Sequence, residues 1–290
     1  YRKRGHHYAT ILLRPYAYDP VKGLLNSPGE ITLTIAYTAV PTTAAPLAKA
    51  TGATEKPGII IVSHDSMETG AAAFRQEKTA EGYPIYSLIL TGNPTASTIR
   101  NSIRTLYNAH PDTQYALLLG DTAAIPTFTA SDNSASDLLY ALLDPGETFS
   151  DYLGKDLITG RVSVNTSDEL LAYTEKLAAF VAAPRHHDLT WISNGNTPSE
   201  YAFAEATHDW VIANALPEGF TNTTFYEGIG TAADLPAGIN TGTDGVIYSG
   251  HGGEFLWSRW NYGIAQVESL ANPLDAPVVF GHCCLTGSFN

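Results

Sequence analysis

Two short stretches of the chain carry residues capable of covalent and acid–base chemistry directly after apolar runs. His251 follows GVIYSG, and Cys283 and Cys284 follow VVFGH. A reactive thiol needs a partner that takes its proton or stabilises its thiolate, and histidine is the usual partner. Because both runs read as strands of an open sheet, we expect their ends to meet at one edge. The pattern favours a nucleophilic thiol paired with an imidazole.

Other interpretations of these residues stay open from their types and spacing alone. A metal site built from His251, His282, Cys283 and Cys284 lacks a CxxC spacing and a second pair of ligands. A vicinal disulfide would require a strained ring. Either cysteine could be a buried core thiol, since free cysteine packs as a small hydrophobe, and His251 could be a turn histidine. Strand alternation predicts that Cys283 and Cys284 point to opposite faces.

Composition excludes several classes of function. The 290 residues include 16 Lys and Arg against 29 Asp and Glu, a net charge of -13 that would repel nucleic acid. No apolar run approaches the roughly 18 residues that a membrane span needs, so we expect no membrane insertion. With 2 Cys, the chain depends on a hydrophobic core. The acidic balance and loops rich in Thr, Ala, Asn and Gly suit a secreted or cell-surface bacterial protein.

The segments that would position these residues alternate between strand and helix patterns, as in α/β proteins. Continuous apolar runs that suit strands buried on both faces alternate with helical segments, which predicts parallel sheets with right-handed crossovers. In the first half we predict strands in GIIIVSHD, YSLILT and YALLLGD, with helices in ETGAAAFRQEKTAEGY and ASTIRNSIRTLYNAH. In the second half we predict helices in SDELLAYTEKLAAFVAAP and EYAFAEATHDWVIANAL, with strands in LTWIS, TTFYEG, DGVIYSGHG and APVVFGHCC.

Changes in this secondary-structure pattern along the chain indicate the domain organisation. Residues 1–46 alternate apolar and polar, in ATILLRPYAYDP and EITLTIAYTAV, and predict a pair of strands; residues 47–57 form a linker. We expect a first α/β subdomain over 58–184 and a second over 185–290 that carries the candidate residues. Ser167 is the predicted N-cap of the helix that ends the first half.

The motifs around these residues resemble the gingipain family of cysteine endopeptidases, within the caspase-like clan. The resemblance rests on SGHGGEFLW and VVFGHCCLTGSF, in the family's order of a His-Gly after one strand and a Cys after the next. Near its nucleophile the family reads Ala-Cys-x-x-Gly and then an aromatic, which aligns Cys284 with the nucleophile and Cys283 with a small residue. Four stretches further upstream also resemble motifs of this family: YALLLGDTAAIP, SASDLLYALLD, DLITGRVSV and HDWVIANAL.

The resemblance implies a fold of two subdomains with largely parallel sheets flanked by helices, preceded by a β-rich segment. It implies hydrolysis of protein or peptide substrates through a thioacyl-enzyme, with no required cofactor. Cys284 would attack the scissile carbonyl, His251 would protonate the leaving amine, and the N–H groups of Gly252 and Cys284 would form the oxyanion hole.

Two further features of the family bear on specificity and on a third catalytic residue. By its offset from His208, Glu205 corresponds to the acid at the base of the specificity pocket, which would favour Arg or Lys; Trp257 resembles an aromatic that lines the same pocket. The family also carries an acid near its catalytic His, where this chain has Ser193 and Asn194. That departure motivates an alternative function, an inactive relative that binds a peptide or partner.

The resemblance also suggests an ion and partners. Loop carboxylates in related enzymes bind calcium as a structural ion, and Asp121, Asp137, Asp144 and Asp151 are the candidates, without an EF-hand spacing. Residues 1–46 resemble the end of a pro-segment, which fits a self-processing zymogen. Because the family continues beyond its nucleophile strand, we expect a further C-terminal chain after Asn290.

Overall fold

The computed structural model describes residues 56–227, 233–258, 260–272 and 274–288, together with the backbone of four short strands in residues 1–55. These strands form two antiparallel pairs: β1 (Arg2–Lys3) with β2 (His6–His7), and β3 (Ala17–Asp19) with β4 (Leu24–Asn26). The strand predicted in EITLTIAYTAV lies outside the described residues. Among the described residues, no helix is both long and apolar enough to cross a membrane.

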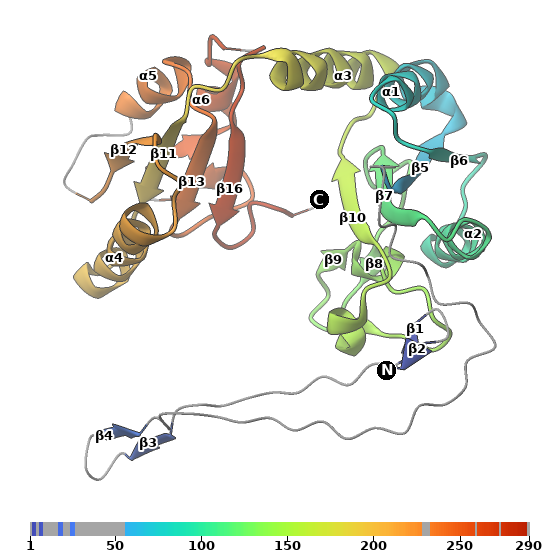
Figure 1. The fold of residues 1–290 in the computed structure, drawn as a ribbon, viewed down its shortest axis with the longest axis horizontal. Coiled ribbons are helices and arrows are strands. Elements are labelled where there is room, and N and C mark those ends of the chain that lie inside the picture. Colours follow the sequence, from blue (N-terminus) through green and yellow to red (C-terminus); the bar gives the residue numbers. More distant parts are fainter. Residues whose placement is uncertain are drawn as a thin grey trace.

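The first half contains a parallel sheet in the order β10-β7-β5-β6 (Figure 1). Its strands are β5 (Gly58–His64), β6 (Ile85–Leu90), β7 (Thr113–Leu119) and β10 (Ile158–Val162). The helices are α1 (Glu68–Ala80), α2 (Ala96–Ala109) and α3 (Ser167–Ala182). The strands β8 (Phe128–Thr129) and β9 (Ala135–Ser136) form a separate antiparallel pair. The first half also contains three 3-10 helices, at Asp65–Met67, Leu138–Tyr140 and Phe149–Gly154.

Strand β5 shows why this sheet needs a continuous apolar run. Ile60 packs into a core with Ile99 and Ile103 of α2, whereas the neighbouring Ile61 packs into a second core with Phe74 of α1. Successive side chains point to opposite faces, so a strand covered by helices on both sides must be apolar at every position. The α/β architecture predicted from the sequence is confirmed.

Helix α3 begins one residue earlier than the sequence predicted. Thr166, and not Ser167, is the N-cap: its side chain accepts a hydrogen bond from the Glu169 N–H. Threonine and serine are both good caps, and the choice depends on which of the two holds an extended backbone. Ser167 already lies in the helix, where its hydroxyl accepts from Gly70 of α1 at 3.4 Å.

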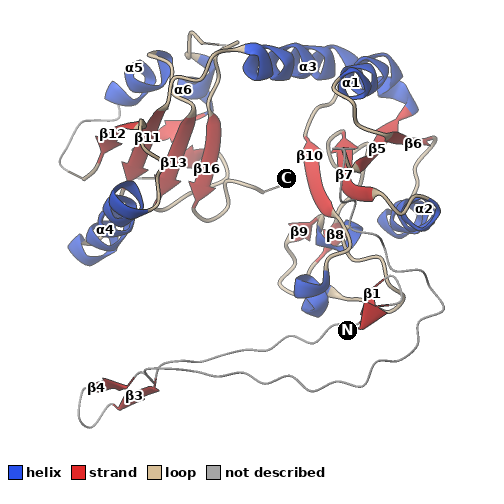
Figure 2. Cartoon of the chain, in the orientation of Figure 1, coloured by secondary structure: helices blue, strands red, loops and turns tan. Residues whose placement is uncertain are grey.

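The second half contains another parallel sheet, in the order β12-β11-β13-β16, with helices on its two sides (Figure 2). Its strands are β11 (Asp188–Ser193), β12 (Thr221–Phe225), β13 (Gly245–Ser249) and β16 (Val278–His282). The helices are α4 (Pro198–Asn214), α5 (Asp234–Asn240) and α6 (Ile264–Glu268), and β14 (Leu256–Trp257) pairs with β15 (Tyr262–Gly263).

The two faces of this sheet carry different neighbours. Val246 and Tyr248 of β13 share a core with Leu235 and Ile239 of α5. Ser249 of β13 instead bonds His208 of α4. Strand alternation therefore separates an α4 face from an α5 face.

The order of the strands creates a switch point between β11 and β13. From β11 the chain crosses through α4 to β12 on one side, and then through α5 to β13 on the other. Loops leaving adjacent strands in opposite directions open a crevice at their carboxyl ends, where ligands bind in open α/β sheets. The loop that carries His251 follows β13 at this point.

Candidate active site

The strand register places His251 and Cys284 at the same distance beyond the ends of two neighbouring strands. Strands β13 and β16 are parallel neighbours, and their last paired residues are Ser249 and His282. His251 and Cys284 each lie two residues beyond these partners. Both candidate residues therefore follow the carboxyl edge of the sheet from adjacent strands.

The loops that carry the two residues are in contact. A Cβ added at Gly252 would collide with the Cys284 carbonyl oxygen and would lie 2.8 Å from Thr286 Cγ2. Separations this short force atoms to move, so only glycine fits at position 252 while the loops keep this distance. The Gly-His-Gly sequence thus allows the histidine loop to approach the cysteine loop.

The two cysteines differ in burial, and both follow the end of β16 at His282. Cys283 is half-buried and packs, as Trp257 and Leu270 do, against the core of the second sheet, with its Sγ 2.8 Å from Thr286 Oγ1. Cys284 is exposed. An exposed thiol beside a histidine loop suits a nucleophile, whereas a packed thiol suits a structural role.

His251 has an acidic partner that the sequence analysis did not identify. Its Nε2 lies 3.0 Å from Oε2 of Glu200, in the first turn of α4. The hydrogen bond from His251 and a second one from the Asn196 N–H hold the pKa of Glu200 below its ordinary value. Glu200 is therefore a carboxylate at neutral pH.

The start of α4 explains how Glu200 reaches this position. Thr197 is the N-cap and accepts from the Glu200 N–H, with Pro198 at the first helical position. The Glu200 carboxylate turns back to accept from Asn196 N–H at 2.7 Å. The pattern Thr-Pro-Ser-Glu is a recognisable helix start and could have located Glu200 at this edge from the sequence. Its contact with His251 depends on the direction of the helix, which the sequence does not reveal.

Asn194, one of the two residues that stand where the resemblance places an acid, holds the backbone of His251. Its Oδ1 accepts from the His251 N–H at 3.3 Å, and its Nδ2 donates to Tyr248 Oη at 2.9 Å. Tyr248 in turn donates to the His251 carbonyl at 2.6 Å. Burial raises the pKa of Tyr248, which stays a donor. The network fixes the loop from which the imidazole extends.

The two N–H groups predicted to form an oxyanion hole are available. Residues on either side of Gly252 make the bonds to the β14 hairpin: Gly253 N–H to Leu256 O, and Ser258 N–H to His251 O, both at 2.9 Å. Within the described part of the chain, neither the Gly252 N–H nor the Cys284 N–H donates to another group. Free N–H groups beside a nucleophile can stabilise a developing oxyanion.

A cavity of about 410 Å³ adjoins His251 on the α4 face. Its walls come from the loop after β11, the first turns of α4 and the end of β13. Phe203 contributes an aromatic side chain that is 76% exposed. The lining residues are Asn194, Ser199, Glu200, Phe203, Ala204, Ser249, Gly250 and His251.

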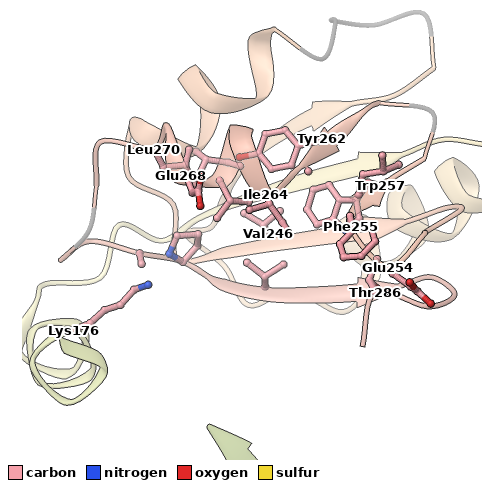
Figure 3. A pocket seen from close by; sticks show the side chains of 17 residues that line it. Lys176, Val246, Glu254, Phe255, Trp257, Tyr262, Ile264, Glu268, Leu270 and Thr286 are labelled. Carbon is pink, nitrogen blue, oxygen red and sulfur yellow. The ribbon is translucent and has the colours of Figure 1, made fainter. Parts of the chain in front are cut away.

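Glu205 and Trp257 do not line one pocket. Glu205 lies on the α4 face, where its Oε1 accepts from Ser193 Oγ at 3.2 Å and from Glu227 N–H at 2.9 Å. Trp257 stacks on Tyr248 on the opposite face, with ring centroids 4.2 Å apart. There it lines a separate apolar cavity of about 390 Å³, beside Phe255 and Tyr262 (Figure 3).

The four aspartates proposed as calcium ligands do not gather. Asp137 forms a two-point ion pair with Arg161, with N–O distances of 2.7 and 2.8 Å. Asp151 accepts from the Thr148 N–H, and Asp121 accepts from the Thr122 N–H. The described residues contain no group of three or more His, Cys, Asp or Glu placed to hold a metal ion. Calcium binding, with Asp144 as the fourth candidate, stays a prediction.

Comparison with known proteins points to one family. The family model of peptidase family C25 matches residues 53–290. Gingipain R2 of Porphyromonas gingivalis is 24% identical over 206 residues, which cover 67% of this chain and 27% of that protein. Gingipain R1 of the same organism is also 24% identical over 206 residues, which cover 20% of it. The chain spans about a quarter of the length of these relatives.

Solved structures share the fold. The crystal structure of the Arg-specific cysteine proteinase gingipain R aligns with a TM-score of 0.67 at 23% identity, covering 81% of this chain and 56% of that one. A complex of Porphyromonas gingivalis RgpB pro- and mature domains aligns with a TM-score of 0.66 at 19% identity, covering 79% and 56%. At these identities the likeness shows the fold alone.

Proposed function

Because the chain belongs to peptidase family C25, we propose that it is a cysteine endopeptidase in which Cys284 is the nucleophile. The observation that supports this most is the placement of exposed Cys284 and of His251 level on adjacent parallel strands, with their loops in contact. The clan's chemistry does not require a direct His–Cys hydrogen bond before substrate binds.

The reaction proceeds in two steps. The Cys284 thiolate attacks the carbonyl carbon of the scissile peptide bond, and the N–H groups of Gly252 and Cys284 donate to the resulting oxyanion. The C–N bond breaks as the His251 imidazolium gives its proton to the leaving amine, which leaves a thioester on Cys284. Water then attacks the thioester with His251 as base, which releases the acid product and restores the thiolate.

Glu200 acts as the positioning residue for His251. Its hydrogen bond to Nε2 orients the ring and favours the imidazolium that donates the proton. Asn194 fixes the backbone of the same histidine. This pair of contacts argues against the alternative of an inactive relative, which was motivated by the missing acid after β11.

We propose that the cleaved residue is Arg or Lys, with Glu205 as the acid that pairs with it. Three carboxylates, those of Glu200, Glu205 and Glu227, belong to the elements at this edge of the sheet, and a cationic side chain suits such surroundings. The gingipain R whose crystal structure aligns with this chain is an Arg-specific cysteine proteinase. The Oε1 atom of Glu205 already accepts two hydrogen bonds, which leaves Oε2 for a substrate guanidinium.

The experiment that tests the proposed function compares the two cysteines. Cys284→Ala should abolish cleavage of an Arg-containing peptide, whereas Cys283→Ala should retain it, because the Cys283 side chain packs away from the exposed thiol. Equal activity of Cys284→Ala and the parent chain would contradict the proposal. The isosteric peptide with neutral citrulline in place of Arg should be a poorer substrate.

Three broader features complete the proposal. Residues 1–46 are the end of a pro-segment, in keeping with the pro-domain complex among the similar structures. Residues 58–184 and 185–290 are separate subdomains, each with its own sheet. The protein is secreted from a bacterial cell or held at its surface, in keeping with relatives that come from a bacterium. Intact mass measured before and after incubation would reveal removal of residues 1–46.

A further inference from the structure

The chain reverses direction immediately after Cys284. The Thr286 N–H donates to the Cys284 carbonyl at 2.7 Å, which closes a three-residue turn around Leu285. The Ser288 N–H then donates to the Leu285 carbonyl at 3.0 Å and closes a second turn. These two turns bring Thr286, which has no part in the reaction steps, back beside the nucleophile.

Leu285 adopts a left-handed backbone in the first of these turns, with φ of 57°. This conformation is uncommon for residues other than glycine, and it persists where neighbouring contacts hold it. The Leu285 side chain is 61% exposed and contributes little packing of its own. The contacts that hold the turn therefore come from the residues next to it.

Thr286 supplies such contacts through three different groups. Its N–H holds the Cys284 carbonyl. Its Oγ1 lies 2.8 Å from Cys283 Sγ, in a hydrogen bond for which either atom can be the donor. Its Cγ2 packs on Gly252 of the histidine loop, since a Cβ added at Gly252 would lie 2.8 Å from it. One residue thus joins the cysteine loop to the histidine loop.

The apolar cavity on the α5 face shows the same bridging position. Thr286 lines this cavity together with Glu254 and Phe255, which follow His251 in the sequence (Figure 3). Thr286 is itself exposed. Its side chain is therefore a spacer at the surface between two loops, and replacing it would leave no cavity in a core.

The two loops that Thr286 joins carry the N–H donors of the proposed oxyanion hole, those of Gly252 and Cys284. Such donors act only when they lie about 2.7–3.1 Å from the oxyanion, and a misplacement of about 1 Å can lower a rate about 100-fold. Thr286 contacts Cys284 through its N–H and Gly252 through its methyl group. The separation of the two donors therefore depends on Thr286.

We propose that Thr286 is a positioning residue for the oxyanion hole, and that its methyl group sets the distance between Gly252 and Cys284. The hydroxyl on the same Cβ contacts Cys283, so the methyl group and not the hydroxyl reaches the histidine loop. Thr286 acts through the two donors and not through contact with substrate. The inference rests on the proposed function, in which Cys284 is the nucleophile.

Three substitutions separate the methyl group from the hydroxyl. Thr286→Ser removes the methyl group and keeps the hydroxyl, whereas Thr286→Val removes the hydroxyl and keeps the branched shape. Thr286→Ala removes both. All three keep the backbone N–H that bonds Cys284. Thr241→Ser, at an exposed threonine before β13, is the matched control for loss of a methyl group.

The test compares two reactions of Cys284 that differ in their need for the oxyanion hole. The Cys284 thiolate adds to the carbonyl carbon of a peptide that ends in arginine aldehyde; a C–S bond forms, and the carbonyl oxygen becomes an oxyanion that His251 can protonate. Iodoacetamide alkylates the same thiolate with release of iodide and forms no oxyanion. The inhibition constant of the aldehyde and the alkylation rate, measured by peptide mass spectrometry at one pH, therefore separate the donors from the reactivity of the thiol.

Thr286→Ser and Thr286→Ala should each raise the inhibition constant of the aldehyde about fivefold to fiftyfold, because Gly252 loses the contact that sets its position. Thr286→Val and Thr241→Ser should stay within about twofold of the parent chain, and iodoacetamide should alkylate Cys284 at similar rates in all of them. In peptide cleavage the loss should appear in kcat and not in KM, since the donors act in the transition state.

Equal aldehyde inhibition of Thr286→Ser and Thr286→Val would overturn the role of the methyl group. A loss of alkylation that matches the loss of aldehyde binding would also overturn it, because the thiol and not the oxyanion hole would then be affected. Failure of the proposed function has a different signature. A parent chain that binds no aldehyde, or a Cys284→Ala variant that binds it as tightly as the parent, would contradict the nucleophile itself.

Discussion

At the scale of single residues, the acid that orients His251 comes from a helix and not from the end of a strand. Glu200 of α4 bonds the imidazole, and Asn194, which follows β11, holds the backbone instead. Glu200 thus orients the imidazole ring and Asn194 fixes the backbone that carries it. The arrangement leads to two predictions about individual side chains.

Glu200→Gln should lower kcat/KM about tenfold to a hundredfold while leaving the fold intact, because the amide can no longer favour the imidazolium. The pKa of Glu200 is depressed in the folded chain, so its stabilising charge is present at neutral pH and is lost as pH falls through that depressed value. The measurement is a pH–rate profile of peptide cleavage. Glu218→Gln, at an exposed glutamate after α4, is the matched control and should match the parent.

Gly252→Ala should reduce cleavage at least tenfold, because the added methyl group would collide with the Cys284 carbonyl and separate the two loops. Gly253→Ala is the control, since its Cβ would meet no atom closer than 3.9 Å. Cleavage rates and alkylation of Cys284 should both respond to the first substitution. Equal rates for the two variants would show that the loops do not need this contact.

The candidate residues that could be predicted from the sequence are those marked by the residues directly before them. His251 and Cys284 stand out because each follows an apolar strand and a glycine, and Cys283 is the more buried of the two cysteines. Glu200 was missed because its role depends on where α4 points. Trp257 was paired with Glu205 by resemblance, yet the β14 hairpin turns it onto Tyr248 and the other face.

At the scale of elements, the first turn of α4 carries part of the site. Thr197 caps this helix and Glu200 follows in its first turn, so the helix start also sets the position of the acid. Thr166 plays the same capping part for α3, where no candidate catalytic residue follows. The two caps offer a matched comparison.

Thr197→Ala and Thr166→Ala should each lower the free energy of unfolding by about 1 kcal/mol, the usual effect of losing an N-cap. Only Thr197→Ala should also lower kcat/KM, because fraying of α4 releases Glu200 from His251. Denaturant titrations and peptide cleavage measure the two effects. A similar loss of activity in both variants would mean that global stability, and not the start of α4, governs activity.

Strands and helices with strong periodicity were predictable, and irregular elements were not. The strand β10 was not predicted as such, because its first residue, Ile158, is 62% exposed and Gly160 and Arg161 interrupt the apolar pattern. The N-cap of α3 was placed one residue late, at Ser167, since two hydroxyl residues stand side by side. Short elements such as α6 carry too few residues to show a period.

At the scale of the whole molecule, the core is divided between the two sheets. Ile103 belongs to a cluster built from β5, β7 and α2, whereas Tyr248 belongs to one built from β13 and α5. Strand β16, which leads to Cys284, is an edge strand whose five residues are all exposed. The site therefore depends on the second sheet and on few contacts beyond it within the described residues.

Ile103→Ala should destabilise the first sheet by about 2–5 kcal/mol, the range for removing a large aliphatic side chain from a core. Alkylation of Cys284 at low denaturant should be unaffected, since the second sheet keeps its own core. Far-UV circular dichroism follows unfolding of the whole chain, whereas tryptophan fluorescence reports on the second half, which holds all 4 tryptophans, so the two probes together distinguish the halves. A parallel shift of both probes would indicate a single cooperative unit.

In the mechanism we propose, Cys284, and not its neighbour, forms the covalent bond to substrate with help from His251. Its most direct test is peptide mapping by mass spectrometry after reaction with an Arg peptide carrying an acyloxymethyl ketone, which alkylates a thiol only where the catalytic groups assist. We expect one adduct, on Cys284, that is strongly reduced in His251→Gln and absent in Cys284→Ala. An adduct on Cys283, or equal labelling of Cys284 without His251, would contradict it.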